Sequence, residues 1–339
     1  MTTKEQVKEY LLRLIARGEP RYAAKAVETF GISKSTVYNY IREMAADHTV
    51  QKDEKGVYTL PTQKKTFAYS NQDLDESRIF QADILPLIRD LPQNVVNVWA
   101  YAFTEMMNNA IEHSEASAIV VTVSRDPLQT NILIGDNGVG IFQKIHDYLL
   151  TTTETDLPLS ECVNLLFTGK FTTNKEAHSG EGIFFTSHIM DSFFVFSDKL
   201  VFTRNNFSDM CFNFDDIDTG TTVAMQLANH SHKTSEEVFN RFTTPDEGFI
   251  NTSVPIAHMF PEGFPVSRSE ARRLGSMFLK FENVTLDFSG VSSIGQAFTH
   301  ELFVVWQRKN PKIKLTYVGA NENVSNMINR VCADARKEL

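Results

Sequence analysis

The sequence is poor in cysteine and has no long apolar run. Three cysteines occur among 339 residues, Cys162, Cys211 and Cys332, and no two of them form a C-x-x-C pair. We therefore expect neither a disulfide framework nor a zinc site, and a reducing cytoplasm fits this usage. No run of about 18 apolar residues is present, and the first residues are not a charged stretch followed by an apolar one. We expect no membrane span and no secretory signal. Internal repeats and low-complexity tracts are also missing.

The composition is that of a core-forming protein with an uneven charge. Apolar residues make up 42% and charged residues 22%, and the length predicts two or three domains. The net charge is -9, yet residues 1–65 hold 12 basic and 8 acidic residues, a balance of +4, which leaves 21 basic and 34 acidic residues, or -13, for the rest. The N-terminal segment is therefore the part suited to a polyanion.

The first 62 residues have the pattern of three helices and a hairpin. Apolar residues recur at helical spacing from Val7 to Ile15, Gly18 and Pro20 break the chain, and helical spacing resumes over 22–30. Ser33 can cap a third helix whose buried stripe is Val37, Ile41 and Met44. Residues 50–60, with a turn at 53–56, are expected to form two short strands.

This pattern resembles a winged helix-turn-helix over residues 1–62. The resemblance implies that polar residues on the exposed side of the third helix contact DNA phosphates and base edges. These residues are Ser33, Lys34, Ser35, Thr36, Tyr38, Asn39 and Arg42. The alternative is a winged helix that serves in dimerisation or in docking another protein.

Residues 63–78 are polar and without a strong period, so they are interpreted as a linker. Residues 79–232 mix helical periods with strand-like segments at 119–123, 131–134, 193–196, 201–203, 210–214 and 222–227. We expect an antiparallel or mixed sheet with helices grouped on one face, an α/β sandwich.

Two segments of this region have residues suited to a nucleotide. In the first, Glu105, Asn109 and His113 recur every four residues, so a helix places them on one face. In the second, a β-branched run ends at Asp136 and is followed by Gly138 and Gly140, where the backbone can approach a ligand closely. Carboxylate and carboxamide oxygens also suit magnesium, which usually takes one or two protein ligands.

These segments resemble the N box and the first glycine box of the GHKL ATP-binding family. His178 to Ile183 resembles its second glycine box, and Gly220 to Met225 resembles its closing strand. Four boxes in the right order are a specific signal, whereas a single G-x-G is weak.

The resemblance implies a role for each site residue. Asn109 would bind the magnesium ion that bridges the ATP phosphates, and Glu105 would orient or deprotonate the attacking water. Asp136 would accept a hydrogen bond from the adenine amino group, with Thr221 beside it. Gly180 and Gly182 would bring helix N-terminal amides to the phosphates.

Other interpretations of the same residues stay open. The alternative for Glu105 is a pair with a side chain one turn away on the helix surface. The alternative for Asp136 is the first residue of a hairpin turn. Lys170 and His178 are candidates for phosphate contact or for solvated loop residues, and His113 is expected to support the site rather than to react.

Residues 233–339 have strands alternating with helices, which predicts a small α/β domain. A capped helix is expected over 267–280, with Ser267 three residues before Glu270. Val284 to Phe298 resembles a STAS domain, but Gly295 to Phe298 lacks the hydroxyl that is phosphorylated in such switches, and the segment is closer to STAS-like domains of unknown function. His300 lies within this pattern, and we do not expect it to be phosphorylated.

The sequence as a whole predicts a multi-domain α/β protein. We expect a cytoplasmic regulator that binds ATP with Mg²⁺, hydrolyses it slowly and couples nucleotide state to double-stranded DNA binding. A protein partner at the STAS-like domain and a homodimer are further expectations. The alternatives are an anti-sigma-like serine/threonine kinase or partner-binding switch, and a DNA-activated defence or repair ATPase.

Overall fold

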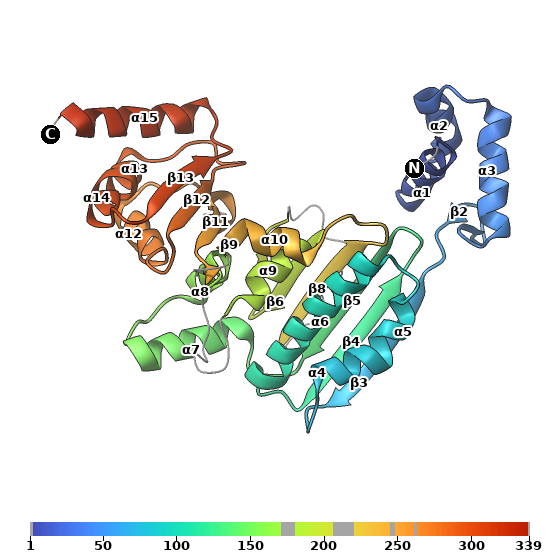
Figure 1. Cartoon of the computed structure of the whole chain (residues 1–339), viewed down its shortest axis with the longest axis horizontal. Helices are drawn as coiled ribbons and strands as arrows, with labels where there is room; N and C mark the ends of the chain where they lie inside the picture. The colour runs from blue at the N-terminus through green and yellow to red at the C-terminus, as the bar shows by residue number, and fades with distance from the viewer. Residues whose placement is uncertain (1–2, 171–179, 206–219, 245–247, 261–262, 338–339) are drawn as a thin grey trace.

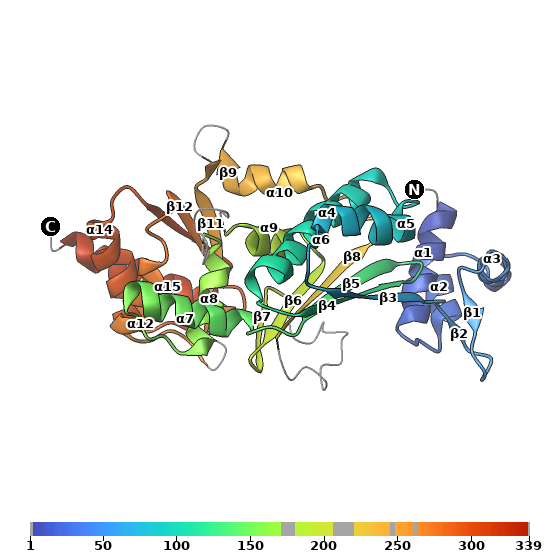
Figure 2. The same cartoon turned by 90° about the horizontal axis from the view of Figure 1, so that it is seen from below.

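The computed structural model describes residues 3–170, 180–205, 220–244, 248–260 and 263–337. It is a mixed α/β protein of several domains, as the sequence predicts. An N-terminal helical unit and a C-terminal α/β unit lie at opposite ends of a central sheet domain (Figure 1). Figure 2 shows the same order along the long axis, with the two chain ends far apart.

The N-terminal unit consists of three helices and a short hairpin. The elements are α1 (Thr3–Ala16), α2 (Tyr22–Phe30), α3 (Lys34–Ala46), β1 (Gln51–Lys52) and β2 (Tyr58–Thr59). Gly31 ends α2 in the left-handed region at φ 63°, and the Ser33 hydroxyl caps α3 by accepting from the Thr36 amide at 3.1 Å. Leu11, Val37 and Ile41 are fully buried in a core that belongs to this unit.

The central domain is built on a six-stranded sheet in the order β3-β4-β5-β8-β6-β7, with every neighbouring pair antiparallel. Its strands are β3 (Gln63–Ser70), β4 (Ala118–Arg125), β5 (Gln129–Asp136), β6 (Ser192–Ser197), β7 (Leu200–Thr203) and β8 (Thr221–Ala228). Strand β3 lies where the sequence predicts a linker over 63–78. The strand predicted at 210–214 lies outside the described residues.

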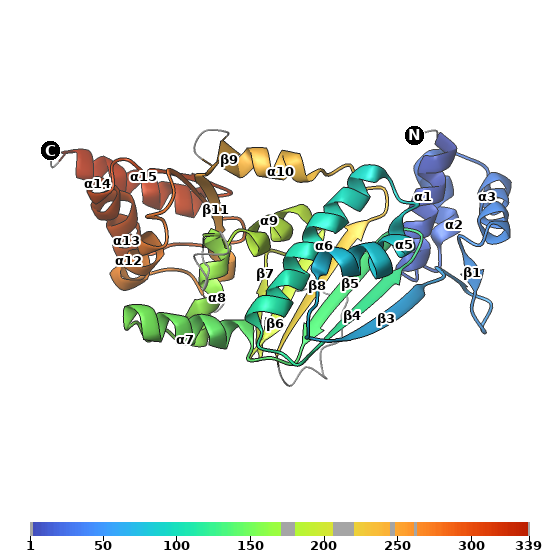
Figure 3. The ribbon, with the colours of Figure 1, turned by 60° about the horizontal axis from the view of Figure 1, so that its bottom comes forward.

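Helices cover one face of this sheet (Figure 3). The helical elements of this domain are α4 (Glu76–Ile79), a π-helical turn (Phe80–Ile84), α5 (Leu85–Ile88), α6 (Gln93–His113), α7 (Ile141–Thr153), α8 (Leu159–Thr168), α9 (Gly182–Ile189) and α10 (Ser235–Phe242). Of these, α7 extends beyond the end of the sheet (Figure 3). The central helix α6 buries Trp99, Phe103 and Met107 against Ile119, Val121 and other inward residues of the strands. Alternate strand residues face this core, as the period of two requires.

The C-terminal unit has a parallel three-stranded sheet in the order β11-β12-β13. A small hairpin of β9 (Thr243–Thr244) and β10 (Gly248–Phe249) leads into β11 (Asn251–Pro255), α11 (Ile256–Met259) and α12 (Arg268–Ser276). Then follow β12 (Asn283–Asp287), α13 (Gln296–His300), a π-helical segment (Glu301–Trp306), α14 (Gln307–Lys309), β13 (Lys314–Val318) and α15 (Glu322–Lys337). Ser267 and Glu270 form the predicted capping box at α12.

The central and C-terminal parts share one hydrophobic core. Buried residues run without a break from Trp99 and Ile134 of the central domain through Phe184 and Phe249 to Leu286 of the C-terminal sheet. The N-terminal core is separate. Among the described residues, no helix combines the length and the apolar character needed to cross a bilayer.

Candidate functional site

A cavity of about 260 Å³ opens in the central domain between α6, α7, α8 and α9 and the ends of β5 and β8. Seven of the nine predicted ATP-site residues line it: Glu105, Asn109, Asp136, Gly140, Gly180, Gly182 and Thr221. The other two, Gly138 and Lys170, are not among its lining residues. Residues from four segments far apart in the sequence therefore meet at one site.

Helix α6 presents the polar face that the spacing of four predicts. Glu105, Asn109 and His113 all line the cavity from successive turns. Met107 and Phe103 are buried on the other side of the helix. Because α6 is anchored by that apolar side, its carboxylate and carboxamide are held at fixed positions along the cavity wall.

Asp136 ends β5 at the bottom of the cavity. Its Oδ1 accepts hydrogen bonds from the Gly138 amide at 2.9 Å and the Thr221 amide at 3.3 Å. Burial raises the pKa of Asp136, and these two amide donors partly oppose the increase. Oδ2 makes no hydrogen bond within the described part of the chain. The carboxylate thus has one oxygen fixed by the backbone and one available to a donor in the cavity.

The glycines around Asp136 allow close approach between protein segments. A Cβ atom on Gly138 would lie 2.0 Å from the Ser114 carbonyl oxygen, and one on Gly220 would lie 2.0 Å from the Asp136 carbonyl oxygen. Gly138 therefore packs the loop after β5 against the end of α6, and only Gly140 of the first pair lines the cavity.

Thr221 acts through its backbone and through a hydroxyl directed to α7. Its amide donates to Asp136, while its Oγ1 accepts from the Ile141 amide at 2.9 Å, together with Ser197 Oγ at 3.1 Å. These hydroxyls satisfy an amide at the start of α7 that has no partner within the helix. Thr221 thereby fixes both the Asp136 carboxylate and the first turn of α7.

Glu105 lies against the start of α9. A Cβ atom on Gly182 would be 2.2 Å from Glu105 Oε2, so a larger residue there would require the end of the Glu105 side chain to move. Burial is the main cause that raises the pKa of Tyr101, and the charges of Glu105 and Glu181 add to the increase. Glu105 on α6 and Glu181, the residue before α9, both line the cavity, as Asp136 does at the end of β5.

Lys170 is directed away from the cavity. Its Nζ donates to the Lys280 carbonyl oxygen at 3.1 Å and lies 5.0 Å from the ring centre of Phe281, both in the C-terminal unit. The phosphate contact that the resemblance implies for Lys170 is therefore not prepared in this structure. His178, the other candidate, lies outside the described residues.

Sequence reasoning missed Lys144 and Glu181, which also line the cavity. Lys144 lies one turn into α7, and its ammonium pairs with Glu115, which follows the end of α6. The spacing from Gly140 to Lys144 was a signal, because a helix that starts at a glycine box returns to the same face after four residues.

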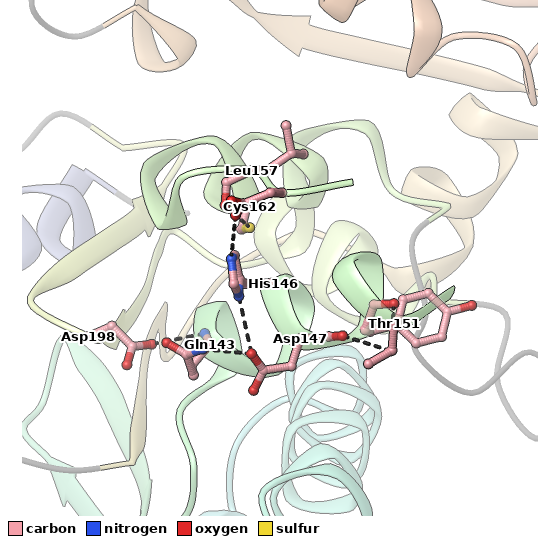
Figure 4. A network of polar contacts seen from close by, with 9 residues as sticks. Gln143, His146, Asp147, Thr151, Leu157, Cys162 and Asp198 are labelled. Atoms are coloured by element: carbon pink, nitrogen blue, oxygen red, sulfur yellow. Dashed lines mark hydrogen bonds and ion pairs between the residues drawn. The ribbon is translucent and has the colours of Figure 1, made fainter. Parts of the chain in front are cut away.

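A polar network lies on α7 beside this cavity (Figure 4). His146 lies between two carboxylates, with Nδ1 at 3.1 Å from Asp147 and Nε2 at 3.1 Å from Asp156. Its hydrogen bonds to Asp147 and then Asp156 raise the pKa of His146. Gln143 donates from its side chain to Asp147 and from its amide to Asp198. The network connects α7 with the segment 154–158 that leads into α8.

The cavity offers hard oxygen donors to a metal ion. Within the described ranges, no group of three or more His, Cys, Asp or Glu side chains could hold an ion. Asn109 and Glu105 nevertheless supply hard oxygen atoms to the cavity, and magnesium bound with a nucleotide needs only one or two such protein ligands.

The proposed DNA-contact residues of α3 mostly face solvent. Lys34, Ser35, Asn39 and Arg42 are exposed, and the Arg42 guanidinium donates to Asn39 Oδ1 at 2.8 Å. Tyr38 is 42% exposed, with Lys34 5.9 Å from its ring centre, whereas Thr36 is half-buried and bonds to the Ser33 hydroxyl. The side chains on this surface are therefore polar or basic and mostly exposed, as contact with a polyanion would require.

Comparison with known proteins identifies two parts of the chain. Residues 97–228 match the histidine kinase-, DNA gyrase B- and HSP90-like ATPase family, and residues 270–325 match a STAS-like domain of unknown function. No curated protein matches the chain. Neither match includes the N-terminal unit. ATPase domains of the first family bind ATP, usually with Mg²⁺. The protein therefore contains a GHKL ATPase domain, which supports an ATP-binding regulatory function, followed by a STAS-like domain.

Proposed function

We propose that the protein is a slow, Mg²⁺-dependent ATPase that couples the nucleotide state of its central cavity to DNA binding by the N-terminal unit. The observation that carries the proposal is Asp136, a desolvated carboxylate with Oδ1 fixed by two amides and Oδ2 available to the cavity. An adenine amino group would supply the missing donor, because a buried acceptor without a partner is costly.

The remaining lining residues suggest where the parts of ATP would lie. Ile134 and Val223 offer apolar surface beside Asp136 for the adenine ring. The amides at the start of α9, after Gly180 and Gly182, would favour phosphate oxygens. We assign Lys144 to the same ligand, because it is a cation in the wall of a cavity that also has the carboxylates of Glu105, Asp136 and Glu181.

The chemistry would then require water activation near the γ-phosphate. Glu105 would orient the attacking water and accept its proton, which balances the addition of hydroxide to phosphorus and the departure of ADP. Asn109 would hold Mg²⁺, which neutralises charge on the phosphates when it is bound. The contact between Glu105 and Gly182 would keep the base next to the amides of α9.

Calorimetric titration with ATP and Mg²⁺ tests the site assignment. We expect micromolar to millimolar binding that is lost in Asp136→Ala and in Asn109→Ala, since each variant leaves a ligand group without its partner in a desolvated site. Glu105→Gln should bind ATP and lose about a hundredfold or more in turnover. Unchanged binding in both of the first two variants would contradict the site, and unchanged turnover in the third would remove Glu105 from catalysis.

DNA binding needs its own test. We expect the intact protein to bind duplex DNA more tightly with a non-hydrolysable ATP analogue, through a dimer that holds two N-terminal units at a fixed spacing. Affinity should fall steeply with salt, because contacts to phosphates release counterions.

A charge-matched control distinguishes α3 from general electrostatics. Lys34→Ala with Arg42→Ala should weaken DNA binding, while Lys312→Ala with Arg330→Ala, two exposed cations of the C-terminal unit, should not. If the first pair binds DNA as the wild type does, or if the wild type does not bind, the N-terminal unit is a protein-docking module. The partner-binding switch would then be the better function.

A further inference from the structure

Arg204 lies where the central domain meets the C-terminal unit. It directly follows β7, and its guanidinium lies 5.4 Å from the ring centre of Phe167 and 5.1 Å from that of Phe184. Desolvation lowers the pKa of Arg204 to about 9, although the residue as a whole retains some solvent exposure. The group is therefore a cation enclosed by protein atoms and protonated at neutral pH.

The hydrogen bonds of Arg204 join three separate elements. Nε donates to Ser187 Oγ on α9 at 3.1 Å, Nη1 to the Ser253 carbonyl on β11 at 3.1 Å, and Nη2 to the Phe167 carbonyl on α8 at 2.5 Å. All three acceptors are uncharged. Phe167 is in the last turn of α8, where carbonyl groups lack helical partners and carry partial negative charge. One planar guanidinium thus holds two helices and the first strand of the C-terminal sheet.

Neighbouring contacts strengthen the same junction. The Thr252 hydroxyl of β11 donates to the Thr168 carbonyl, the last residue of α8, at 2.9 Å. Lys170 and Lys280 exchange bonds through each ammonium and the other's carbonyl oxygen, at 3.1 and 2.8 Å. Gly169 has φ 95°, and a Cβ atom there would lie 2.5 Å from the Phe184 ring.

The other side of these helices lines the cavity. Leu165 and Leu166 of α8 and Ile183 of α9 face it, and Phe184 both lines the cavity and lies beneath the Arg204 guanidinium. The STAS-like unit is thus connected to the rear of the cavity wall through a single layer of side chains. A displacement of β11 would change the position of Ser253 and, through Arg204, that of α9.

We propose that Arg204 is a positioning residue that couples occupancy of the cavity to the placement of the STAS-like domain, and this rests on the proposed nucleotide site. Ligand binding that fixes α8 and α9 would favour one position of β11, and a partner that holds β11 would change nucleotide affinity by the same factor. This coupling requires the three separate N–H donors in the plane of a guanidinium, whose geometry an ammonium group cannot reproduce.

Conservative substitution with a matched control tests the coupling. We expect Arg204→Lys and Arg204→Met to weaken ATP binding about tenfold, and Ser187→Ala and Thr252→Val to weaken it less. Arg125→Met is the control, because Arg125 also makes a network of three bonds, to both oxygens of Asp90 and the Leu87 carbonyl, on another edge of the same domain. It should lower the melting temperature and leave ATP affinity unchanged.

The outcomes separate the coupling from the site. If the wild type binds ATP and the folded Arg204→Lys, Ser187→Ala and Thr252→Val variants bind it equally well, the coupling is wrong while the proposed function stands. If Arg125→Met weakens ATP binding as much as the Arg204 variants do, the coupling is also wrong, because a general loss of stability would then explain the weaker binding. If the wild type binds no ATP, the proposed function fails and the coupling with it. Ser187→Ala and Thr252→Val keep the test valid even if the Arg204 variants do not fold.

Discussion

The two ends of the molecule are attached to the ATPase domain in different ways. The N-terminal unit has its own core, and in the described part of the chain Leu128, in the turn between β4 and β5, is the central-domain residue that packs against that core. The STAS-like end shares a continuous core with the domain and is held by Arg204 and Thr252. A shared core transmits displacements, whereas a separate core allows the unit to move as a body.

This difference assigns different tasks to the two ends. Occupancy of the cavity is expected to act on the STAS-like unit directly, through α8 and α9. It is expected to act on the N-terminal unit through dimerisation, which changes the relative position of two such units without changing their internal fold. Changes at the two attachments should therefore differ in which part of the molecule they affect.

Truncation in each core should separate the two attachments. Phe249 is 4% exposed and lies 4.8 Å from the Phe184 ring centre, so Phe249→Ala should lower the stability of the central and C-terminal parts together by about 3–5 kcal/mol. Leu11→Ala should lower only that of the N-terminal unit, by about 2–5 kcal/mol. Calorimetric scans would show which transition moves. A loss of ATP affinity in Leu11→Ala would contradict the contrast.

Adding one methyl group at the start of α9 should affect turnover more than binding. A Cβ atom at Gly182 would lie 2.2 Å from Glu105 Oε2, so Gly182→Ala should displace the proposed base and reduce turnover about a hundredfold. Gly263→Ala is the control, because no atom lies within 4 Å of its added methyl group. Steady-state rates that are equal in the two variants would argue against Glu105 as the base.

Removing the contact at the N-terminal end should have a small and local effect. Leu128 is half-buried, so Leu128→Ala should lower the stability of the N-terminal unit by about 1 kcal/mol and leave ATP affinity unchanged. Calorimetry and ATP titration would measure both quantities. A weaker affinity for ATP would mean that this end, too, is coupled to the cavity.

The smallest effect concerns pH and the His146 network. Asp147 and Asp156 raise the pKa of His146 above its usual value of about 6.5. A raised pKa in the folded state means that the stabilisation is fully present below about pH 6.5 and is lost as pH rises through the folded value. An NMR titration should show this shift, and Asp147→Asn should reduce it. A His146 signal that titrates at the usual value would disprove the pairing.

The sequence predicted the elements whose pattern is local. Apolar segments located β4, β5, β6 and β8, and capping residues located the starts of α3 and α12 at Ser33 and Ser267. Strand β3 was missed because its first four residues are exposed at the sheet edge and polar, so no buried face marks them. Strand β11, a five-residue strand in which buried and half-buried residues alternate, was also missed.

The sequence indicated which residues line the cavity better than it indicated which partners their side chains contact. Spacing along α6 correctly brought Glu105, Asn109 and His113 to one cavity. Lys170 was a candidate for phosphate contact or for a solvated loop residue, and its ammonium instead bonds to the Lys280 carbonyl oxygen, a partner 110 residues away that no local pattern indicates. Arg204 was missed for the same reason, since its acceptors come from α8, α9 and β11.

Amide hydrogen exchange with and without ATP and Mg²⁺ would show which end of the molecule responds to the nucleotide. We expect nucleotide to slow exchange in α8, α9 and β11, which lie on both sides of the Arg204 junction, and to leave α1 and α2 unchanged. The protection at β11 should disappear in Arg204→Lys. Protection confined to the cavity, or spread equally to α1 and α2, would contradict the claim that the cavity acts directly on the STAS-like end and not on the N-terminal unit.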